Sequence, residues 1–188
     1  MVSEGVISYC KLFSLGKAFG LLYNFKKLTP SILHSFFNPN KYAEHGKAIA
    51  SVRAGNVIGG GDWCENRIIP DCIKSIEKNQ EIDVRRPNAV RPWQHVLEPI
   101  GGYLYLGTKM IEDPVRYSEA WNFGPEHENI IPVSELVTKL IESYGQGSWK
   151  DISNSNQLHE ATLLSLDINK AKTNLNWSPV LGIDATIE

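Results

Sequence analysis

The sequence predicts an α/β fold, and three observations carry that prediction. Short apolar, partly β-branched runs typical of strands alternate along the chain with longer stretches of helical spacing. The composition, 42% apolar and 10% aromatic over 188 residues, is that of a globular domain with a sizeable core. The sequence shows neither an internal repeat nor a low-complexity tract. Parallel strands joined by helices account for this pattern.

A marginal amphipathic helix is predicted over residues 11–27. Its apolar residues recur at steps of three and four, as one face of a helix requires: Leu12, Leu15, Phe19 and Leu22. Two glycines inside the stretch each cost a helix about 1 kcal/mol, and Pro30 ends it. Packing on the domain is the first interpretation, and a membrane-surface helix is the alternative. Lysines interrupt the apolar run, which is typical neither of a signal peptide nor of a transmembrane helix.

A strand, a glycine-rich loop and a helix are expected to follow in order. Residues 47–52, KAIASV, form a short apolar run typical of a buried strand. The stretch RAGNVIGGGDW directly after it holds four of the chain's fifteen glycines in eleven residues. Residues 66–78 then carry a helical stripe, in which Pro70 fits only the first turn. Because α/β proteins bind ligands at the carboxyl ends of their strands, this loop is the first candidate site.

The middle of the chain predicts two short strands and a closely packed helix. Residues 81–84 and 93–96 are strand candidates on either side of a proline-bearing turn. Helical spacing follows over residues 97–111, with apolar positions at Ile100, Leu104 and Leu106. Gly101 and Gly102, side by side in this helix, favour a close approach to another element.

The last part of the chain predicts one more strand and three helices. Residues 120–123, AWNF, form the strand. A helix over residues 134–144 should be capped by Ser134, whose hydroxyl can accept a backbone N–H that the first turn leaves unpaired. Asp167 is expected to cap the next helix, and GIDATIE at the end of the chain resembles the start of another.

Charge and cysteine content exclude several classes of protein. Nineteen basic and twenty-one acidic residues give a net charge of −2, which provides no overall positive field for nucleic acid or an anionic membrane. The three cysteines, Cys10, Cys64 and Cys72, have no C-x-x-C spacing, which argues against a disulfide framework and a zinc site. The five histidines are scattered, so no metal is expected. We therefore expect a reducing, cytoplasmic setting and no nucleic-acid partner.

Residue patterns alone leave the chemistry of the glycine loop open. The loop matches neither G-x-G-x-x-G nor G-x-x-x-x-G-K-[ST], so it is not one of the common phosphate loops. Arginines are concentrated in and after it: Arg53, Arg67, Arg85, Arg86 and Arg91. Guanidinium groups bind phosphate through paired hydrogen bonds, which suits a phosphorylated ligand, and pairing with surface carboxylates is the alternative. No Ser or Cys lies in a recognisable nucleophile motif.

Several stretches, in this order, are similar to those of a known family: SFFNPNKYAEHGKAIASVRAGNVIGGGDW, NRIIPDCI, RPNAVRPWQHVLEP, GYLYL, AWNFGP, HEATLLSLD and KAKTNLNWSP. From about residue 35 onward the chain resembles the C-terminal half of the CDP-glucose 4,6-dehydratases. These enzymes belong to the extended short-chain dehydrogenase/reductase superfamily, also called the NAD-dependent epimerase/dehydratases. RAGNVIGGGDW together with RPWQHVLEP is similar to this subgroup in particular.

The resemblance implies a fold, a reaction and a cofactor. It implies the last strands and helices of a Rossmann-type domain plus the small C-terminal domain that binds the nucleotide-sugar, incomplete at both ends. In this family NAD takes a hydride from C4 of CDP-glucose, water leaves across C5 and C6, and the hydride returns at C6. The product, CDP-4-keto-6-deoxyglucose, serves lipopolysaccharide biosynthesis. Implied partners are CDP-glucose or a related nucleotide-sugar and, as is usual in the family, a second subunit in a homodimer.

The resemblance also assigns substrate-binding residues by position. Asn56 of RAGNV would hydrogen-bond the sugar-diphosphate region, and Arg91 of RPW would pair with a phosphate. Arg67 in ENRIIPD, and His159 with Glu160 in HEA, are implied nucleotide contacts. The glycine loop would face the sugar diphosphate and the nicotinamide.

The family's catalytic residues are not found in register, so no catalytic residue is assigned. Its Tyr-x-x-x-Lys pair would fall on Ala18 and Leu22. Tyr23 and Lys27 have the right spacing but come later in the sequence, and coincidence is the first interpretation. The family's glycine-rich dinucleotide loop is missing too. The family also often has an aromatic residue where this chain has Leu163.

These departures predict a divergent N-terminal segment, residues 1–34, joined to a family-like segment, residues 35–188. The first interpretation is then a truncated dehydratase that is inactive alone and whose binding of NAD is doubtful. The second is a non-catalytic module that binds nucleotide-sugars or covers a partner chain. The third is a membrane-associated interaction protein that uses its basic N-terminus.

Overall fold

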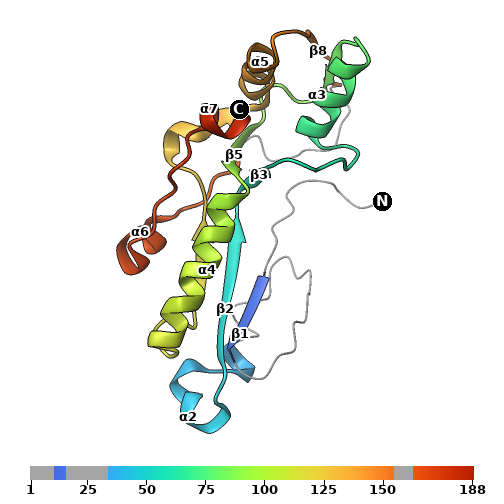
Figure 1. The fold of residues 1–188 in the computed structure, drawn as a ribbon. Coiled ribbons are helices and arrows are strands. Elements are labelled where there is room, and N and C mark those ends of the chain that lie inside the picture. Colours follow the sequence, from blue (N-terminus) through green and yellow to red (C-terminus); the bar gives the residue numbers. More distant parts are fainter. Residues whose placement is uncertain (1–10, 16–33, 155–162) are drawn as a thin grey trace.

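The computed structural model describes residues 11–15, 34–154 and 163–188, and these form an elongated α/β structure (Figure 1). Helix α4 (Leu97–Glu112) lies along the strands in the lower part of the figure. Helices α3 (Ile68–Glu77) and α5 (Val133–Tyr144) lie together at the upper end. The α/β prediction is confirmed.

The lower sheet has the strand order β1 (Lys11–Leu15), β2 (Ala48–Ala54) and β6 (Ala120–Phe123). β2 and β6 are parallel, with Ser51 opposite Ala120. All residues of β2 except Arg53 are buried. Such a nearly continuous apolar run is typical of a parallel strand that is covered on both faces.

The prediction of a helix over residues 11–27 is wrong at its beginning, because residues 11–15 form β1. This strand runs antiparallel to β2, with Lys11 opposite Val52 and Leu15 opposite Ala48. The backbone groups along the edge of β2 need partners, and a strand satisfies them where a helix cannot. Residues 16–27 of the predicted helix lie outside the described part of the chain.

Helix α4 covers the lower sheet through one of its faces. Tyr103, Leu106 and Met110 are buried there in a cluster with Phe123 and other residues of β2, β6 and α6. Gly102 belongs to the same face, because a Cβ on it would overlap the ring of Phe123. Helix and sheet approach each other closely at this point, as the glycine pair predicted.

The expected apolar stripe of α4 is partly wrong. Ile100 and Leu104 are exposed, and only Leu106 of the three predicted positions is buried. Gly101 also has open space around its Cβ direction, unlike Gly102. The helix therefore has two apolar faces, and the one that covers the sheet is centred on Leu106.

The upper part is built on shorter strands. In the described residues, β3 (Asn56–Ile58) runs parallel to β5 (Val90–His95), which runs antiparallel to β7 (Ile130–Pro132). A separate parallel pair joins β4 (Ile82–Val84) to β8 (Trp149–Asp151). The strands expected over 81–84, 93–96 and 120–123 are thus confirmed, while β3, β7 and β8 were not predicted.

A second apolar core lies between α3, α5 and the β4–β8 pair. Its fully buried members are Cys72, Ile76, Ile82, Val84 and Val137. Helix α3 confirms the prediction over 66–78, with Pro70 in its first turn, where a missing backbone N–H costs nothing. Burial raises the pKa of the Cys72 thiol to about 12, so this thiol stays protonated and unreactive near neutral pH.

The remaining described elements are short. A 3-10 turn (Pro39–Lys41) leads into α2 (Tyr42–His45), and a second one (His127–Asn129) precedes β7. The chain ends with α6 (Asn169–Leu175) and α7 (Ile183–Ile187). The predicted helices at the end of the chain are confirmed.

The two predicted helix caps differ in outcome. Ser134 is not the cap of α5, because the helix begins one residue earlier and Pro132 occupies the capping position. Ser134 donates its backbone N–H to the carbonyl of Pro87 over 2.9 Å. Asp167 does not occupy the capping position of α6 either, because that position is Ile168. Its carboxylate nevertheless accepts the backbone N–H of Asn169, the first residue of α6, over 2.9 Å, so it satisfies a free N–H of the first turn.

The buried carboxylate of Glu98 ties the end of the chain to the start of α4. Its Oε1 accepts the backbone N–H of Val180 over 2.9 Å and that of Leu181 over 2.6 Å. Glu98 is 7% exposed. Two donors on one buried carboxylate compensate for its desolvation.

Within the described residues, no helix combines the length and the apolar character needed to cross a membrane.

Candidate functional site

The glycine loop follows β3 rather than β2. Residues 56–58 pair with β5, so the chain leaves the lower sheet at Gly55 and enters the upper one before the loop begins. Gly55 lies so close to the carbonyl of Pro92 that a Cβ would collide with it. Gly61 has a φ of 78°, which favours glycine. The loop is thus the connection from β3 to α3.

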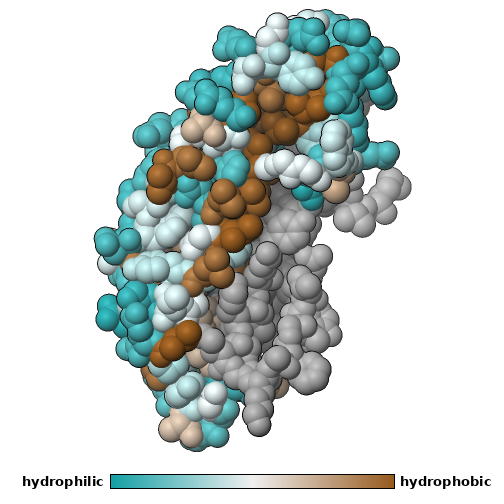
Figure 2. All heavy atoms as spheres, in the orientation of Figure 1, coloured by the Kyte–Doolittle hydropathy of each residue, from teal (hydrophilic) through white to brown (hydrophobic). Residues whose placement is uncertain are grey.

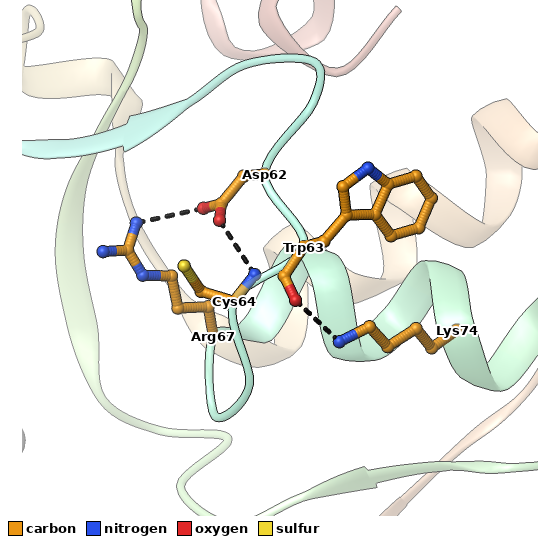
Figure 3. Close-up of polar contacts among 5 residues, drawn as sticks. All are labelled: Asp62, Trp63, Cys64, Arg67 and Lys74. Atoms are coloured by element: carbon orange, nitrogen blue, oxygen red, sulfur yellow. Dashed lines mark hydrogen bonds and ion pairs between the residues drawn. The ribbon is translucent and has the colours of Figure 1, made fainter.

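Three polar contacts fasten the glycine loop to the beginning of α3 (Figure 3). Oδ1 of Asp62 accepts the backbone N–H of Cys64 over 3.1 Å, and Oδ2 accepts Nη1 of Arg67 over 3.0 Å. Nζ of Lys74, in the second turn of α3, donates to the carbonyl of Trp63 over 2.9 Å. The predicted nucleotide contact Arg67 is therefore held by Asp62, at the residue before α3.

The Asp62 carboxylate is stabilised in its charged form. Partial burial alone would raise its pKa, but the hydrogen bond from Cys64 and the charge of Arg67 outweigh burial. Together they hold the pKa of Asp62 below its ordinary value. The loop contact is consequently ionised at neutral pH, so both partners are charged.

A second group of charged residues lines a cleft of about 280 Å³ beside α3 and β4. Nη2 of Arg85 donates to Oδ1 of Asn66 over 2.7 Å. The cleft is lined by Asp71, Lys74, Ser75, Ile82, Asp83, Arg85 and Ile152. Burial raises the pKa of Asp71, and the charges of Lys74 and Arg85 oppose that rise. Two cations and two carboxylates thus share one open cleft beside α3 and β4.

Asn56 and Arg91 lie on one face of the β3–β5 pair. Asn56 is directly opposite Trp93 in the parallel register. Side chains alternate along a strand, so Arg91, two residues before Trp93, projects on the same side as Asn56.

Arg91 is unusual because it is a buried cation. It is 7% exposed, and its Nη1 donates to the carbonyl of Val90 over 2.9 Å. Asn56, in contrast, is half-buried. Burial strengthens every hydrogen bond that the guanidinium makes, because water competes less for its N–H groups.

The remaining predicted contacts, His159 and Glu160, lie outside the described residues. Leu163, the first residue described after them, forms a parallel bridge with Val90, and the backbone N–H of Leu164 donates to the Val90 carbonyl over 3.1 Å. Residue 163 therefore lies beside the strand that carries Arg91. Leu163 itself is 64% exposed.

The described residues do not form a cradle for the pyrophosphate of NAD. Such a cradle needs glycine N–H groups that lead directly from a parallel strand into a helix. Here α4 follows β5 without a glycine at its start, and residues 62–67 separate the glycines from α3. In the described part, His, Cys, Asp and Glu side chains form no group of three that could hold a metal ion.

Reasoning from the sequence missed Asp62, Lys74 and Asp71. Asp62 stands in the quoted glycine motif, and its distance from Arg67 in the sequence could have indicated the pair. Lys74 lies on α3 seven residues, about two turns, after the predicted contact Arg67, so the helical period could have placed both on one side. Asp71 has no such indication, because its role depends on the approach of Arg85 from β4.

No protein-family model matches the chain. A curated protein does: the CDP-glucose 4,6-dehydratase of Salmonella typhimurium strain LT2 is 45% identical to the chain over 154 residues. These residues are 82% of the chain but 43% of the Salmonella enzyme. The chain thus spans less than half the length of this relative.

Solved structures of low sequence identity share the fold. A dTDP-glucose 4,6-dehydratase of Bacillus anthracis in complex with NAD has a TM-score of 0.63 at 16% identity, over 96% of this chain and 56% of its own. A UDP-glucuronic acid 4-epimerase of Bacillus cereus, in complex with UDP-glucuronic acid and NAD, has a TM-score of 0.61 at 16% identity, over 72% and 41% of the two chains.

A third structure, the dTDP-glucose 4,6-dehydratase of Streptomyces venezuelae with NAD and TYD bound, has a TM-score of 0.62 at 18% identity, over 79% of this chain and 45% of its own. These neighbours show a Rossmann-type fold of NAD-dependent sugar-nucleotide enzymes. The sequence match narrows the relationship further. Over 82% of its length the chain is similar to a CDP-glucose 4,6-dehydratase, a member of the NAD-dependent epimerases and dehydratases.

Proposed function

We propose that the chain forms the nucleotide-sugar-binding part of a CDP-glucose 4,6-dehydratase. One observation carries the proposal. Asn56 and Arg91 stem from the two motifs most similar to this subgroup, and the β3–β5 pairing puts them on one sheet face. Both side chains suit a sugar diphosphate, since a guanidinium binds phosphate oxygens and an amide can both donate and accept.

The burial of Arg91 supports a role in binding an anion. A guanidinium that is largely withdrawn from water can bind an anionic group through charge-assisted hydrogen bonds for which water competes less. Arg67 is a second cation near the same loop, although Asp62 holds it. We propose that Arg91 binds the diphosphate and that Arg67 contributes from the loop. The contacts of His159 and Glu160 stay predictions, as does the boundary at residue 34.

We further propose that the 188-residue chain, assayed alone, does not convert CDP-glucose. Removal of the C4 hydride requires a base for the hydroxyl proton, and the family's tyrosine and lysine would fall on Ala18 and Leu22. NAD would supply the hydride acceptor, but the described residues do not fit its pyrophosphate. The chemistry would then need residues from a longer protein or a partner.

Binding of CDP-glucose to the full chain tests the first proposal. Titration calorimetry on Asn56→Ala and Arg91→Ala should show weaker binding, and Arg91→Ala should lose about 1.5–3 kcal/mol with its charge-assisted contact. Arg53→Ala is the matched control, because Arg53 is an exposed arginine on β2, which belongs to the other sheet. Circular dichroism verifies that each variant folds. Equal affinity of Arg91→Ala and the parent would remove Arg91 from the site.

Labelling of Cys64 gives an independent readout of the same site. Cys64 is an exposed free thiol in the glycine loop, whereas Cys72 is buried. CDP-glucose should slow the reaction of Cys64 with a maleimide if the sugar diphosphate lies over the loop. The same measurement with UDP-glucose and dTDP-glucose tests whether the site distinguishes the nucleotide base. The free thiols also suit the cytoplasmic setting that we propose.

Activity is tested separately, from the ultraviolet absorbance of the 4-keto product in base. We expect the purified chain with CDP-glucose and NAD to match a control without protein. Product that disappears in Tyr23→Phe would overturn this expectation and would assign Tyr23 and Lys27 as the displaced pair.

A further inference from the structure

Residues 180–187, which we call the C-terminal strap, pack against the sheet face that carries Asn56 and Arg91. Helix α7 forms most of the strap and lies beside α5 and β5 (Figure 1). Figure 2 shows apolar residues gathered around α5 and α7 at this end of the molecule. Ile183 of the strap is buried in one apolar cluster with Trp93 of β5. Because Trp93 is directly opposite Asn56, the strap covers the apolar part of the proposed binding face.

Two buried side chains bind the backbone at the start of the strap. Oε1 of Glu98, in the first turn of α4, accepts the N–H groups of Val180 and Leu181. Oδ1 of Asn129, at the end of the 3-10 turn before β7, accepts the N–H of Ile183 over 3.0 Å. Glu98 and Asn129 are each 7% exposed, so water competes little for these contacts. The position of the strap therefore depends on side chains from two other elements.

The strap has little structure of its own that could hold it without these two anchors. Helix α7 has five residues, far fewer than a helix needs to be stable alone in water. Its ion pair, Asp184 with Lys139 of α5, contributes little because Asp184 is exposed. Loss of the anchors should therefore release the strap at a lower cost in free energy than the unfolding of an apolar core.

We propose that Glu98 and Asn129 are positioning residues for nucleotide-sugar binding. They hold the strap against Trp93, and so they fix the sheet face on which Asn56 and Arg91 lie. Both act through the strap rather than through contact with the ligand. This inference rests on the proposed function, which assigns Asn56 and Arg91 to the ligand. Binding and closure of the strap are then coupled in both directions, because a ligand that prefers the closed strap also stabilises it.

Thiol labelling measures how often the strap opens. Thr186 lies in α7 and is 6% exposed, so the thiol of Thr186→Cys should react with a maleimide only when the strap opens. Cys10 and Cys64 are replaced by serine in this variant. Cys72 stays as the reference, because it is fully buried between α3 and α5 and reacts only when that core unfolds. Ala185→Cys is the matched control, since residue 185 is exposed on the same helix.

The labelling rates separate opening of the strap from unfolding of the core. Thr186→Cys should react faster than Cys72, because the strap opens while the core stays folded. Saturating CDP-glucose should slow the reaction of Thr186→Cys by about fivefold or more, the usual range of coupling between two sites. Ala185→Cys should react rapidly, and CDP-glucose should not change its rate.

Variants of the anchors test their effect on affinity, measured by titration calorimetry of the full chain. Glu98→Gln removes the charge and keeps the size of the side chain, whereas Glu98→Ala removes the acceptor. Binding of CDP-glucose should weaken in that order, by about fivefold or more in Glu98→Ala, and Asn129→Ala should act in the same direction. Glu112→Gln is the matched control, because Glu112 is an exposed carboxylate at the other end of α4, paired with Lys109. Circular dichroism verifies that each variant folds.

Two outcomes would overturn the inference while the proposed function stands. The first is an affinity that Glu98→Ala and Asn129→Ala leave unchanged, since the strap would then only stabilise the fold. The second is labelling of Thr186→Cys that CDP-glucose does not slow, although it slows the labelling of Cys72. A parent chain that does not bind CDP-glucose would overturn the proposed function itself, and the coupling with it.

Discussion

The lower sheet and the glycine loop that leads into α3 are held by different kinds of contact. In the lower part, β2, β6 and α4 bury Val52, Leu106 and Phe123 completely, in one apolar cluster. In the upper part, the connection from β3 to α3 is held by polar contacts such as Asp62 with Arg67 and Lys74 with Trp63. The apolar cluster is stabilised by side chains that fill its volume. The loop is stabilised by charges and by the geometry of its hydrogen-bond donors.

This difference separates the residues that stabilise the fold from those that are available to bind a ligand. A substitution in the lower part should change the free energy of unfolding more than it changes the binding of a ligand. A substitution in the loop should do the reverse, because exposed polar contacts contribute little to folding. The predictions below test that division, beginning with the largest expected effect.

Phe123→Ala should destabilise the chain by about 3–5 kcal/mol, since it removes a fully buried ring and leaves a cavity. Denaturant unfolding measures the change. Trp63→Ala is the comparison from the loop: Trp63 is 59% exposed, so its loss should change the free energy of unfolding by less than about 0.5 kcal/mol. Similar losses in both variants would contradict the division between the two parts.

Neighbouring glycines of α4 should respond with opposite sign. Gly102→Ala forces a methyl group into the buried ring of Phe123, and overpacking of this kind costs about 1–3 kcal/mol. Gly101→Ala meets open space and removes a weak helix former, so it should stabilise by about 1 kcal/mol. Thermal unfolding in dilute solution compares the two. A destabilising Gly101→Ala would contradict the assignment of this position to open space.

Asp62 should give the smallest effect, visible mainly as a pH dependence. Its pKa is lowered in the folded chain, so the unfolded chain binds more protons near the ordinary value of 3.8. Its contribution is therefore present above pH 3.8 and is lost as the pH falls further. Because the pair with Arg67 is about one-third exposed, the loss should stay below about 1 kcal/mol.

Urea unfolding of the parent and of Asp62→Asn, at neutral pH and below pH 3.8, measures this contribution. The parent should lose its advantage over the variant in acid. Burial raises the pKa of Asp71, so that residue contributes in the opposite direction as the pH rises above 3.8. A constant difference between parent and variant at both pH values would mean that Asp62 does not titrate as the loop geometry implies.

The elements with a strong apolar period could be predicted from the sequence. The run of β2 is buried except for Arg53, and the stripe of α3 faces the core, with Cys72 and Ile76 buried and its other isoleucines packed against them. β3, β7 and β8 were not predicted, because each has three residues, too few for a period to appear. In α4 the period was found, but two apolar faces compete, and only the tertiary contact with Phe123 decides which one faces the sheet.

The site could be predicted in its residue types but not in its arrangement. The glycines and arginines indicated an anion-binding loop, and the resemblance named Asn56 and Arg91. That Arg91 is buried follows from the position of β5 between β3 and β7, which no local pattern reports. The ion pair of Arg67 with Asp62 depends on the path of the loop, which glycines leave open because they permit many backbone conformations.

Because the carboxylate of Glu98 accepts the backbone N–H groups of Val180 and Leu181, the exchange of these two amide hydrogens reports on folding. The side chain of Val180 is 87% exposed, so a map of accessible surface would assign fast hydrogen–deuterium exchange to this position. Its N–H nevertheless points at a buried anion. Exchange there needs the end of the chain to separate from the first turn of α4. The exchange rate at Val180 would therefore measure how often residues 180–181 separate from α4. A measurement of side-chain exposure would not detect this opening.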